Sequence, residues 1–149
     1  MPERPQLVAD RPVRDLLAVQ LAVAHGDGPL LIVAGGISAH RHVIANELDA
    51  DAGWWQAQAC VLHHHRVLAI DWLADGDGLD APIDSADQAD AIAAVIEALG
   101  LPKARAFIGA SYGAMVGLQF AAKYPQRLTS LVAISGANFS PDAPAWRDA

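Results

Sequence analysis

The hydrophobic positions of this 149-residue chain form short apolar runs that alternate with segments of helical spacing. Four of these runs are short and bounded by turn residues, which predicts buried strands; they cover residues 30–34, 66–71, 104–108 and 128–135. A longer apolar run over 15–24 is predicted as another strand, paired with 30–34 as an antiparallel hairpin through the turn at 25–29. Residues 1–14 carry three prolines and mixed charges, and we expect a loose lead-in there.

Helical spacing is clearest over residues 84–99. Apolar residues recur there at i, i+3, i+4 and i+7, which predicts a buried stripe made of Ile92, Val95, Ile96 and Leu99. Ser85 and Gln88 fit a capping box at its start. A second helix is predicted over 112–124, and Ser38 is a candidate N-cap for a short helix through Leu48. Strands alternating with helices predict an α/β fold with a mostly parallel sheet and right-handed crossovers.

The segment between the strand at 104–108 and the helix at 112–124 reads Gly109-x-Ser111-x-Gly113. A serine at a sharp strand-to-helix turn has its hydroxyl exposed at the strand's carboxyl end, beside the free N–H groups of the helix N-terminus. Glycines two positions before and after leave room for neighbouring backbone. We interpret the segment as a nucleophile elbow with Ser111 as nucleophile; the alternative is a small-residue turn in another doubly wound protein.

Gly35 and Gly36 directly follow the strand at 30–34. In folds with a nucleophile elbow, the loop after this strand supplies one N–H to the oxyanion hole and the residue after the nucleophile supplies the other. The second donor is then Tyr112, and a plain glycine turn is the alternative for Gly35 and Gly36. Trp54 and Trp55 are predicted to pack within a loop, or alternatively to form the wall of a substrate pocket.

Composition excludes several classes of function. The net charge of -7 argues against nucleic acid or an anionic membrane as partner. The single cysteine, Cys60, cannot form an internal disulfide, which fits the cytoplasm. No signal peptide or membrane-spanning run is expected. The consecutive side chains of His63, His64 and His65 point in different directions, so we predict no metal site and a solvent-exposed approach to the next strand.

The residues that would move the proton of Ser111 are not evident. A serine nucleophile needs a histidine base and a carboxylate to orient it, and in this fold both follow the serine. No histidine follows Ser111, and the only acids after it are Asp142 and Asp148. We therefore expect an N-terminal part of a larger catalytic unit, with the strand at 128–135 as an exposed hydrophobic edge of poor solubility.

Five segments carry a more specific signal, and they lie in this order: Gly35-Gly36-Ile37-Ser38-Ala39-His40-Arg41-His42-Val43, Gly53-Trp54-Trp55, Val67-Leu68-Ala69-Ile70-Asp71-Trp72-Leu73, Ala81-Pro82-Ile83-Asp84 and Gly109-Ala110-Ser111-Tyr112-Gly113-Ala114-Met115. Together they resemble the N-terminal half of homoserine O-acyltransferases of the α/β-hydrolase superfamily, over residues 16–147. The strand segment that ends in Ile70-Asp71-Trp72-Leu73 and the elbow segment are most similar to the homoserine O-succinyltransferases rather than the homoserine O-acetyltransferases. The resemblance implies an α/β-hydrolase domain over 15–136, truncated before the lid and the last strands, with an irregular tail over 137–149 where the lid would begin.

The resemblance also implies acyl transfer in two steps, as a part of methionine biosynthesis. Ser111 would take an acetyl or succinyl group from acyl-CoA and pass it to the hydroxyl of L-homoserine, with no bound cofactor. The N–H of Tyr112 and one N–H from Gly35 or Gly36 would hold the oxyanion. Arg41 would meet a carboxylate or phosphate of a substrate, or would be an ordinary surface arginine. A homodimer is compatible with the full-length family.

The chain departs from the family in two respects, and two other hypotheses stay open. The catalytic Asp and His are not found, and Gln56–Arg66 contains no glycine where the family has a glycine-bearing loop. The chain is therefore expected to be inactive or incomplete by itself. The alternatives are a fragment of a serine esterase or other hydrolase, and a non-catalytic α/β module that binds a partner through its open sheet edge.

Overall fold

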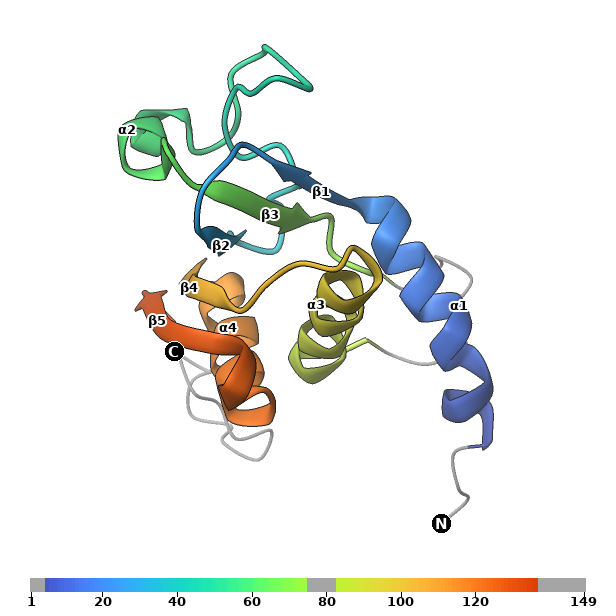
Figure 1. The fold of residues 1–149 in the computed structure, drawn as a ribbon. Helices are drawn as coiled ribbons and strands as arrows, with labels where there is room; N and C mark the ends of the chain where they lie inside the picture. Colours follow the sequence, from blue (N-terminus) through green and yellow to red (C-terminus); the bar gives the residue numbers. More distant parts are fainter. Residues whose placement is uncertain (1–4, 75–82, 137–149) are drawn as a thin grey trace.

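A computed structural model describes residues 5–74 and 83–136 of the chain. Its centre is a five-stranded sheet in the order β1-β3-β2-β4-β5 (Figure 1). The strands are β1 (Ala22–His25), β2 (Leu30–Ala34), β3 (Arg66–Ile70), β4 (Ala104–Ala110) and β5 (Leu128–Ile134). Strands β3, β2, β4 and β5 are parallel, and β1 lies antiparallel at the edge beside β3. The predicted α/β class with a mostly parallel sheet is confirmed.

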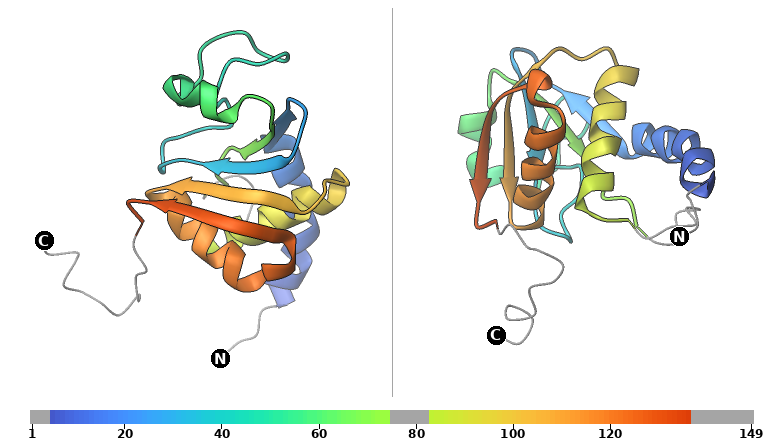
Figure 2. Two further views of the ribbon diagram at one scale, coloured as in Figure 1. Left: turned by 60° about the vertical axis from the view of Figure 1, so that its left-hand side comes forward. Right: turned by 90° about the horizontal axis from the view of Figure 1, so that it is seen from below.

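The two faces of the sheet are covered differently. Helices α3 (Ser85–Ala98) and α4 (Tyr112–Lys123) lie on one face, and α1 (Pro5–Leu21) packs beside α3 (Figure 2). On the other face lie α2 (Ala59–Leu62), the 3-10 turn η1 (Gln56–Gln58) and the irregular segment before them. A second 3-10 turn, η2 (Pro125–Arg127), joins α4 to β5. Helical cover is therefore concentrated on the α3–α4 face.

Strand side chains alternate between two hydrophobic clusters, as the two-residue period of a strand requires. The larger cluster lies under α3 and α4 and includes Ile32, Leu68 and Phe107. The smaller cluster lies on the opposite face and includes Leu31 and Val67 from the same strands. The aromatic rings of Phe107 and Phe120, both fully buried, lie 5.6 Å apart and attach α4 to the centre of the sheet.

The N-terminal region differs from the prediction. Within the described residues, the loose lead-in expected over 1–14 is wrong from Pro5 onward, where α1 begins. The strand expected over 15–24 is also wrong, because only Ala22–His25 is strand. Ala18 is fully buried and Leu17 and Leu21 pack against the core. This i, i+1, i+4 spacing is that of a helix face, and it outweighs the apolar run that suggested a strand.

The predicted hairpin between the first two strands is also wrong. β3 lies between β1 and β2, with His25 of β1 opposite Val67. Gly26 and Gly28 have φ angles of +81° and +115°, and a Cβ on Gly28 would collide with the carbonyl group of His64. The turn between β1 and β2 therefore passes directly over the residues that lead into β3, which only glycine allows.

The helix predicted over 84–99 is confirmed, with a cap shifted by one residue. Asp84 is the N-cap; it accepts from the Asp87 N–H over 2.9 Å, and the Asp87 carboxylate accepts from the Asp84 N–H over 3.1 Å. The expected pair, Ser85 and Gln88, does not form this box. Of the predicted stripe, Leu99 is 44% exposed while its other three members are buried.

The short helix predicted from Ser38 through Leu48 does not form. Local hydrogen bonds from side chains to backbone hold this segment: Asn46 Oδ1 accepts from the Leu48 N–H, and Gln56 Oε1 accepts from the Ala45 N–H. Such bonds compete with helix formation. The turn-rich segment after residue 74, Ala81-Pro82 and the tail over 137–149, with Asp142 and Asp148, lie outside the described residues.

Candidate active site

Ser111 occupies the single residue between β4 and α4, at the carboxyl end of β4. Its backbone has φ 55° and ψ -116°, a conformation that costs of order 1–3 kcal/mol for a residue with a side chain. Its N–H donates to the Ile134 carbonyl oxygen over 2.9 Å, and the residue is exposed. The sharp strand-to-helix turn predicted from the sequence is therefore present, with the serine at its apex.

The two glycines of the motif are required by close backbone contacts. A Cβ on Gly109 would collide with the carbonyl group of Gly113, and a Cβ on Gly113 would collide with the carbonyl group of Ala34. The Gly113 N–H donates to the Gly35 carbonyl oxygen over 2.9 Å. The first turn of α4 therefore rests directly on the end of β2 and on the loop after it.

The loop after β2 is fixed by its carbonyl groups. The Gly36 carbonyl oxygen accepts from the Ala39 N–H over 3.0 Å and from Trp72 Nε1 over 2.9 Å. In a trans peptide the N–H points away from the preceding carbonyl, so these bonds also fix the direction of the Ile37 N–H. Gly35 and Gly36, predicted as oxyanion residues, lie beside the start of α4, where Tyr112 is located.

The adjacent tryptophans support this loop from the other side. The rings of Trp54 and Trp55 are stacked, with centroids 5.2 Å apart and an interplanar angle of 15°. The Trp54 ring lies so close to Gly35 that a Cβ there would approach it to 2.7 Å, and Trp54 Nε1 donates to the His40 carbonyl oxygen over 2.7 Å. Trp55 packs on the smaller core cluster. These contacts favour the loop-packing interpretation, and a role in substrate binding stays a prediction.

Arg41 is held by structural contacts on both sides. Its N–H donates to Asp71 Oδ1 over 2.8 Å, its Nε lies 3.8 Å from Asp71 Oδ2, and its Nη1 donates to the Gln20 carbonyl oxygen over 3.0 Å. These bonds attach the loop to the end of β3 and to α1. A substrate anion would have to compete with Asp71 for this guanidinium, which favours the surface-arginine alternative.

Two residues that sequence reasoning missed, Trp72 and Gln88, connect these parts. The Trp72 ring meets the Tyr112 ring edge-on, with centroids 5.1 Å apart. The Gln88 side chain is 2% exposed; its amide oxygen accepts from the Leu73 N–H and its amide nitrogen donates to the Leu73 carbonyl oxygen. A polar residue on the buried face of a helix, four positions before Ile92, is the signal that could have identified Gln88.

The Tyr112 ring points toward α3, and a contribution of its backbone N–H to an oxyanion hole stays a prediction. Burial raises the pKa of the Tyr112 phenol, a hydrogen bond with Gln88 lowers it in part, and the charges of Asp84 and Asp87 raise it further. The phenol is therefore neutral in the physiological pH range.

The histidines are not arranged around Ser111. All six are among the described residues, and no hydrogen bond there joins any of them to the serine hydroxyl. His25 is buried, and burial lowers its pKa. His63 and His64 are exposed at the start of β3, as the sequence predicts. Within residues 5–74 and 83–136, no three His, Cys, Asp or Glu side chains are grouped to hold a metal ion.

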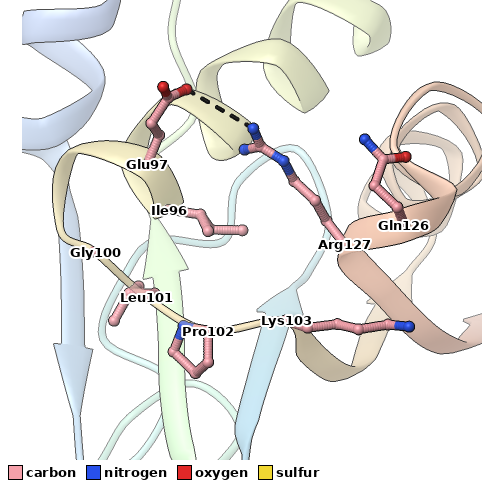
Figure 3. A pocket seen from close by; sticks show the side chains of 8 residues that line it. All are labelled: Ile96, Glu97, Gly100, Leu101, Pro102, Lys103, Gln126 and Arg127. Carbon is pink, nitrogen blue, oxygen red and sulfur yellow. Dashed lines mark ion pairs between the residues drawn. The ribbon is translucent and has the colours of Figure 1, made fainter.

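A pocket of about 430 Å³ lies at the amino end of β4, the end opposite Ser111 (Figure 3). The Glu97 carboxylate and the Arg127 guanidinium approach to 3.8 Å across it. Because the pocket lies at the opposite end of β4 from Ser111, it is not part of the candidate active site.

No helix in the described part of the chain is long and apolar enough to cross a membrane.

The chain is similar in sequence to a known fold family and to a known enzyme. Residues 28–149 match the α/β hydrolase fold family. A homoserine O-succinyltransferase from Xanthomonas campestris pv. campestris is 44% identical over 155 residues, which cover 97% of this chain and 42% of that protein. The chain thus spans less than half the length of this relative.

Solved structures show the same fold at lower identity. Esterase E22 superposes with a TM-score of 0.66 and 21% identity, covering 81% of this chain and 42% of that one. A homoserine O-acetyltransferase from Staphylococcus aureus superposes with a TM-score of 0.63 and 20% identity, covering 85% and 42%. Both proteins share the arrangement of sheet and helices described above.

Proposed function

Because this chain belongs to the α/β hydrolase fold family, we propose that it carries the nucleophile of a homoserine O-acyltransferase. The reaction would move an acetyl or succinyl group from acyl-CoA to the hydroxyl of L-homoserine, a step of methionine biosynthesis in the cytoplasm. The observation that carries the proposal is the position of Ser111 at the apex of the β4–α4 turn, beside the loop of Gly35 and Gly36. The similarity to a homoserine O-succinyltransferase supports the choice of substrates.

The first half-reaction forms an acyl-enzyme. The Ser111 hydroxyl oxygen attacks the thioester carbonyl carbon while its proton passes to a base. The carbonyl oxygen becomes an oxyanion held by the N–H of Tyr112 and an N–H of Gly35 or Gly36. Collapse of this intermediate breaks the carbon–sulfur bond, and the CoA thiolate leaves and takes the proton. The exposed position of Ser111 at the N-terminus of α4 supports this role.

The second half-reaction releases the product. The L-homoserine hydroxyl loses its proton to the same base and attacks the ester carbon of the acyl-enzyme, again through an oxyanion. The bond to Ser111 breaks, the serine oxygen recovers a proton, and O-acyl-homoserine leaves. No step needs a bound cofactor.

The base and its carboxylate partner, in this proposal, come from outside the described residues. No histidine follows Ser111 in the sequence, although this fold places its base after the nucleophile. The described histidines make their contacts elsewhere. We therefore propose that the 149 residues alone do not complete the reaction.

The test measures CoA release from acetyl-CoA and from succinyl-CoA, with and without L-homoserine. It uses protein isolated from its native source, so that any associated chain is retained. We expect steady CoA release that depends on L-homoserine and that disappears in Ser111→Ala. Hydrolysis of a nitrophenyl ester without any effect of L-homoserine would replace the proposal with a serine esterase. Undiminished CoA release by Ser111→Ala would reject both.

A further inference from the structure

Trp72 lies between the two backbone segments that would form the oxyanion hole. Its indole Nε1 donates to the Gly36 carbonyl oxygen over 2.9 Å. Its ring meets the Tyr112 ring at 88°, with centroids 5.1 Å apart. One side chain from the end of β3 therefore contacts both the loop after β2 and the first residue of α4.

The backbone around Trp72 is fixed on both sides. The buried Gln88 side chain binds both the N–H and the carbonyl group of Leu73, over 3.1 and 2.8 Å. On the other side, the Asp71 N–H donates to the Leu21 carbonyl oxygen over 3.0 Å. Trp72 is thus attached to a rigid support, and its indole N–H is not free to follow a moving loop.

The same segment holds the loop at a second point. Asp71 Oδ1 accepts from the Arg41 N–H over 2.8 Å, while the Trp72 indole holds Gly36. The segment 36–41 is therefore attached to the residues that follow β3 at two points, through Gly36 and through Arg41. Only the contact at Gly36 lies beside the elbow, because Gly35 is the residue that binds the Gly113 N–H.

We propose that Trp72 is a positioning residue for the oxyanion hole, a role that rests on the proposed function of Ser111. The Gly36 carbonyl lies in the peptide plane that carries the Ile37 N–H, and the indole bond sets the rotation of that plane. The Gly36 N–H lies in the plane before it, whose Gly35 carbonyl accepts from the Gly113 N–H. Trp72 therefore holds the Gly36 backbone on its carbonyl side, directly next to the proposed donor. The ring contact holds the first residue of α4, whose N–H is the other donor. Donors of this kind act only when their geometry is fixed before the reaction, and Trp72 fixes one group relative to the other.

The first test is Trp72→Phe in protein isolated from its native source; the variant keeps an aromatic ring against Tyr112 and removes the indole N–H together with the second ring. Loss of a complete oxyanion donor lowers kcat by about 10²–10³-fold, so loss of its support should lower kcat by about 10-fold or more. The KM for acyl-CoA should change by less than about twofold, because the oxyanion forms only after binding. A kcat equal to that of the unchanged protein would overturn the proposal.

The matched control is Tyr124→Phe, at the other end of α4. It also removes one side-chain donor, whose bond to Asp90 is 2.6 Å long, and it should leave kcat unchanged. An equal fall of kcat in both variants would mean that a general loss of stability is being measured. If Trp72→Phe fails to fold, replacement of Trp72 by 3-benzothienylalanine keeps the bicyclic shape without the N–H, and the same results are expected.

A second measurement separates this proposal from the proposed function. Phenylboronic acid forms a tetrahedral adduct with a nucleophilic serine, whatever the natural acyl donor is, and its affinity depends on the oxyanion hole. We expect Ser111→Ala to lose binding and Trp72→Phe to bind about 10-fold or more weakly. Normal binding by Trp72→Phe would overturn the role of Trp72 alone. Equal binding by the unchanged protein and Ser111→Ala would overturn the nucleophile and, with it, the role of Trp72.

Discussion

The Gly113 N–H donates a hydrogen bond of 2.9 Å to the Gly35 carbonyl oxygen, so the helix after Ser111 is joined directly to the loop after β2. This contact requires both backbones to approach without a Cβ between them. Sequence motifs at 35–36 and at 109–113 are therefore two sides of one packing arrangement.

Gly113→Ala should destabilise the protein, because the new Cβ would collide with the carbonyl group of Ala34. We expect the free energy of unfolding, measured by urea titration, to fall by about 2 kcal/mol. Gly36→Ala is the matched control, since a Cβ at Gly36 meets no atom within 4 Å; its stability should stay within about 0.5 kcal/mol of the unchanged protein. Equal stability of both variants would contradict the tight approach of α4 to β2.

Ser111→Gly should be more stable than Ser111→Ala. Ser111 has φ 55°, which a side chain disfavours and glycine adopts freely, and its side chain makes no capping hydrogen bond that either variant would lose. The relief of strain exceeds the added flexibility of glycine in the unfolded chain, so we expect a difference of about 1 kcal/mol in unfolding free energy. A more stable alanine variant would show that the turn is not strained.

Gln88→Leu should cost stability although it adds an apolar side chain to the core. It would leave the N–H and the carbonyl group of Leu73 without the partners they have now. Unsatisfied buried groups cost about 1–3 kcal/mol each, so the unfolding free energy should fall by about 2–3 kcal/mol in total. Gln126→Leu, at an exposed position, is the control; a loss as large as that of Gln88→Leu would contradict the role of the buried amide.

Stability should decrease in alkali because of Tyr124. Burial, the hydrogen bond to Asp90 and the charge of Asp90 raise the pKa of Tyr124 from 10.0 to about 12. A group whose pKa is raised by folding holds its proton more tightly in the folded state, so stability is retained below pH 10 and is lost as the pH rises to about 12. Unfolding free energies of the unchanged protein and Tyr124→Phe should converge over this interval. A constant difference between them would contradict the raised pKa.

The elements with strong local signals were predictable, and those fixed by distant contacts were not. The elbow follows from three small residues between an apolar run and a helix, and the structure places Ser111 at the predicted turn. The placement of β1 beside β3 depends instead on backbone contacts between Gly28 and His64, which no local pattern encodes.

In the candidate site, too, residues within a local motif were predictable and residues placed by distant contacts were not. The positions of Gly35 and Tyr112 beside the elbow could be predicted because a motif names them. The position of Trp72 could not, because it depends on a hydrogen bond to a backbone carbonyl far away in the sequence. Gln88 was assigned to a helix cap, since Ser85-x-x-Gln88 fits that pattern, yet Asp84 and Asp87 form the cap and leave Gln88 to the core.

Strand β5 is the outer strand of the described sheet, and its side chains Val132 and Ile134 are 45% and 42% exposed. An open edge with β-branched residues is a template for pairing with another strand. Folding of one chain is a first-order process, whereas pairing of two such edges is second-order in concentration. We therefore expect dilution to favour the folded form of this chain, and the yield on refolding to fall as the protein concentration rises.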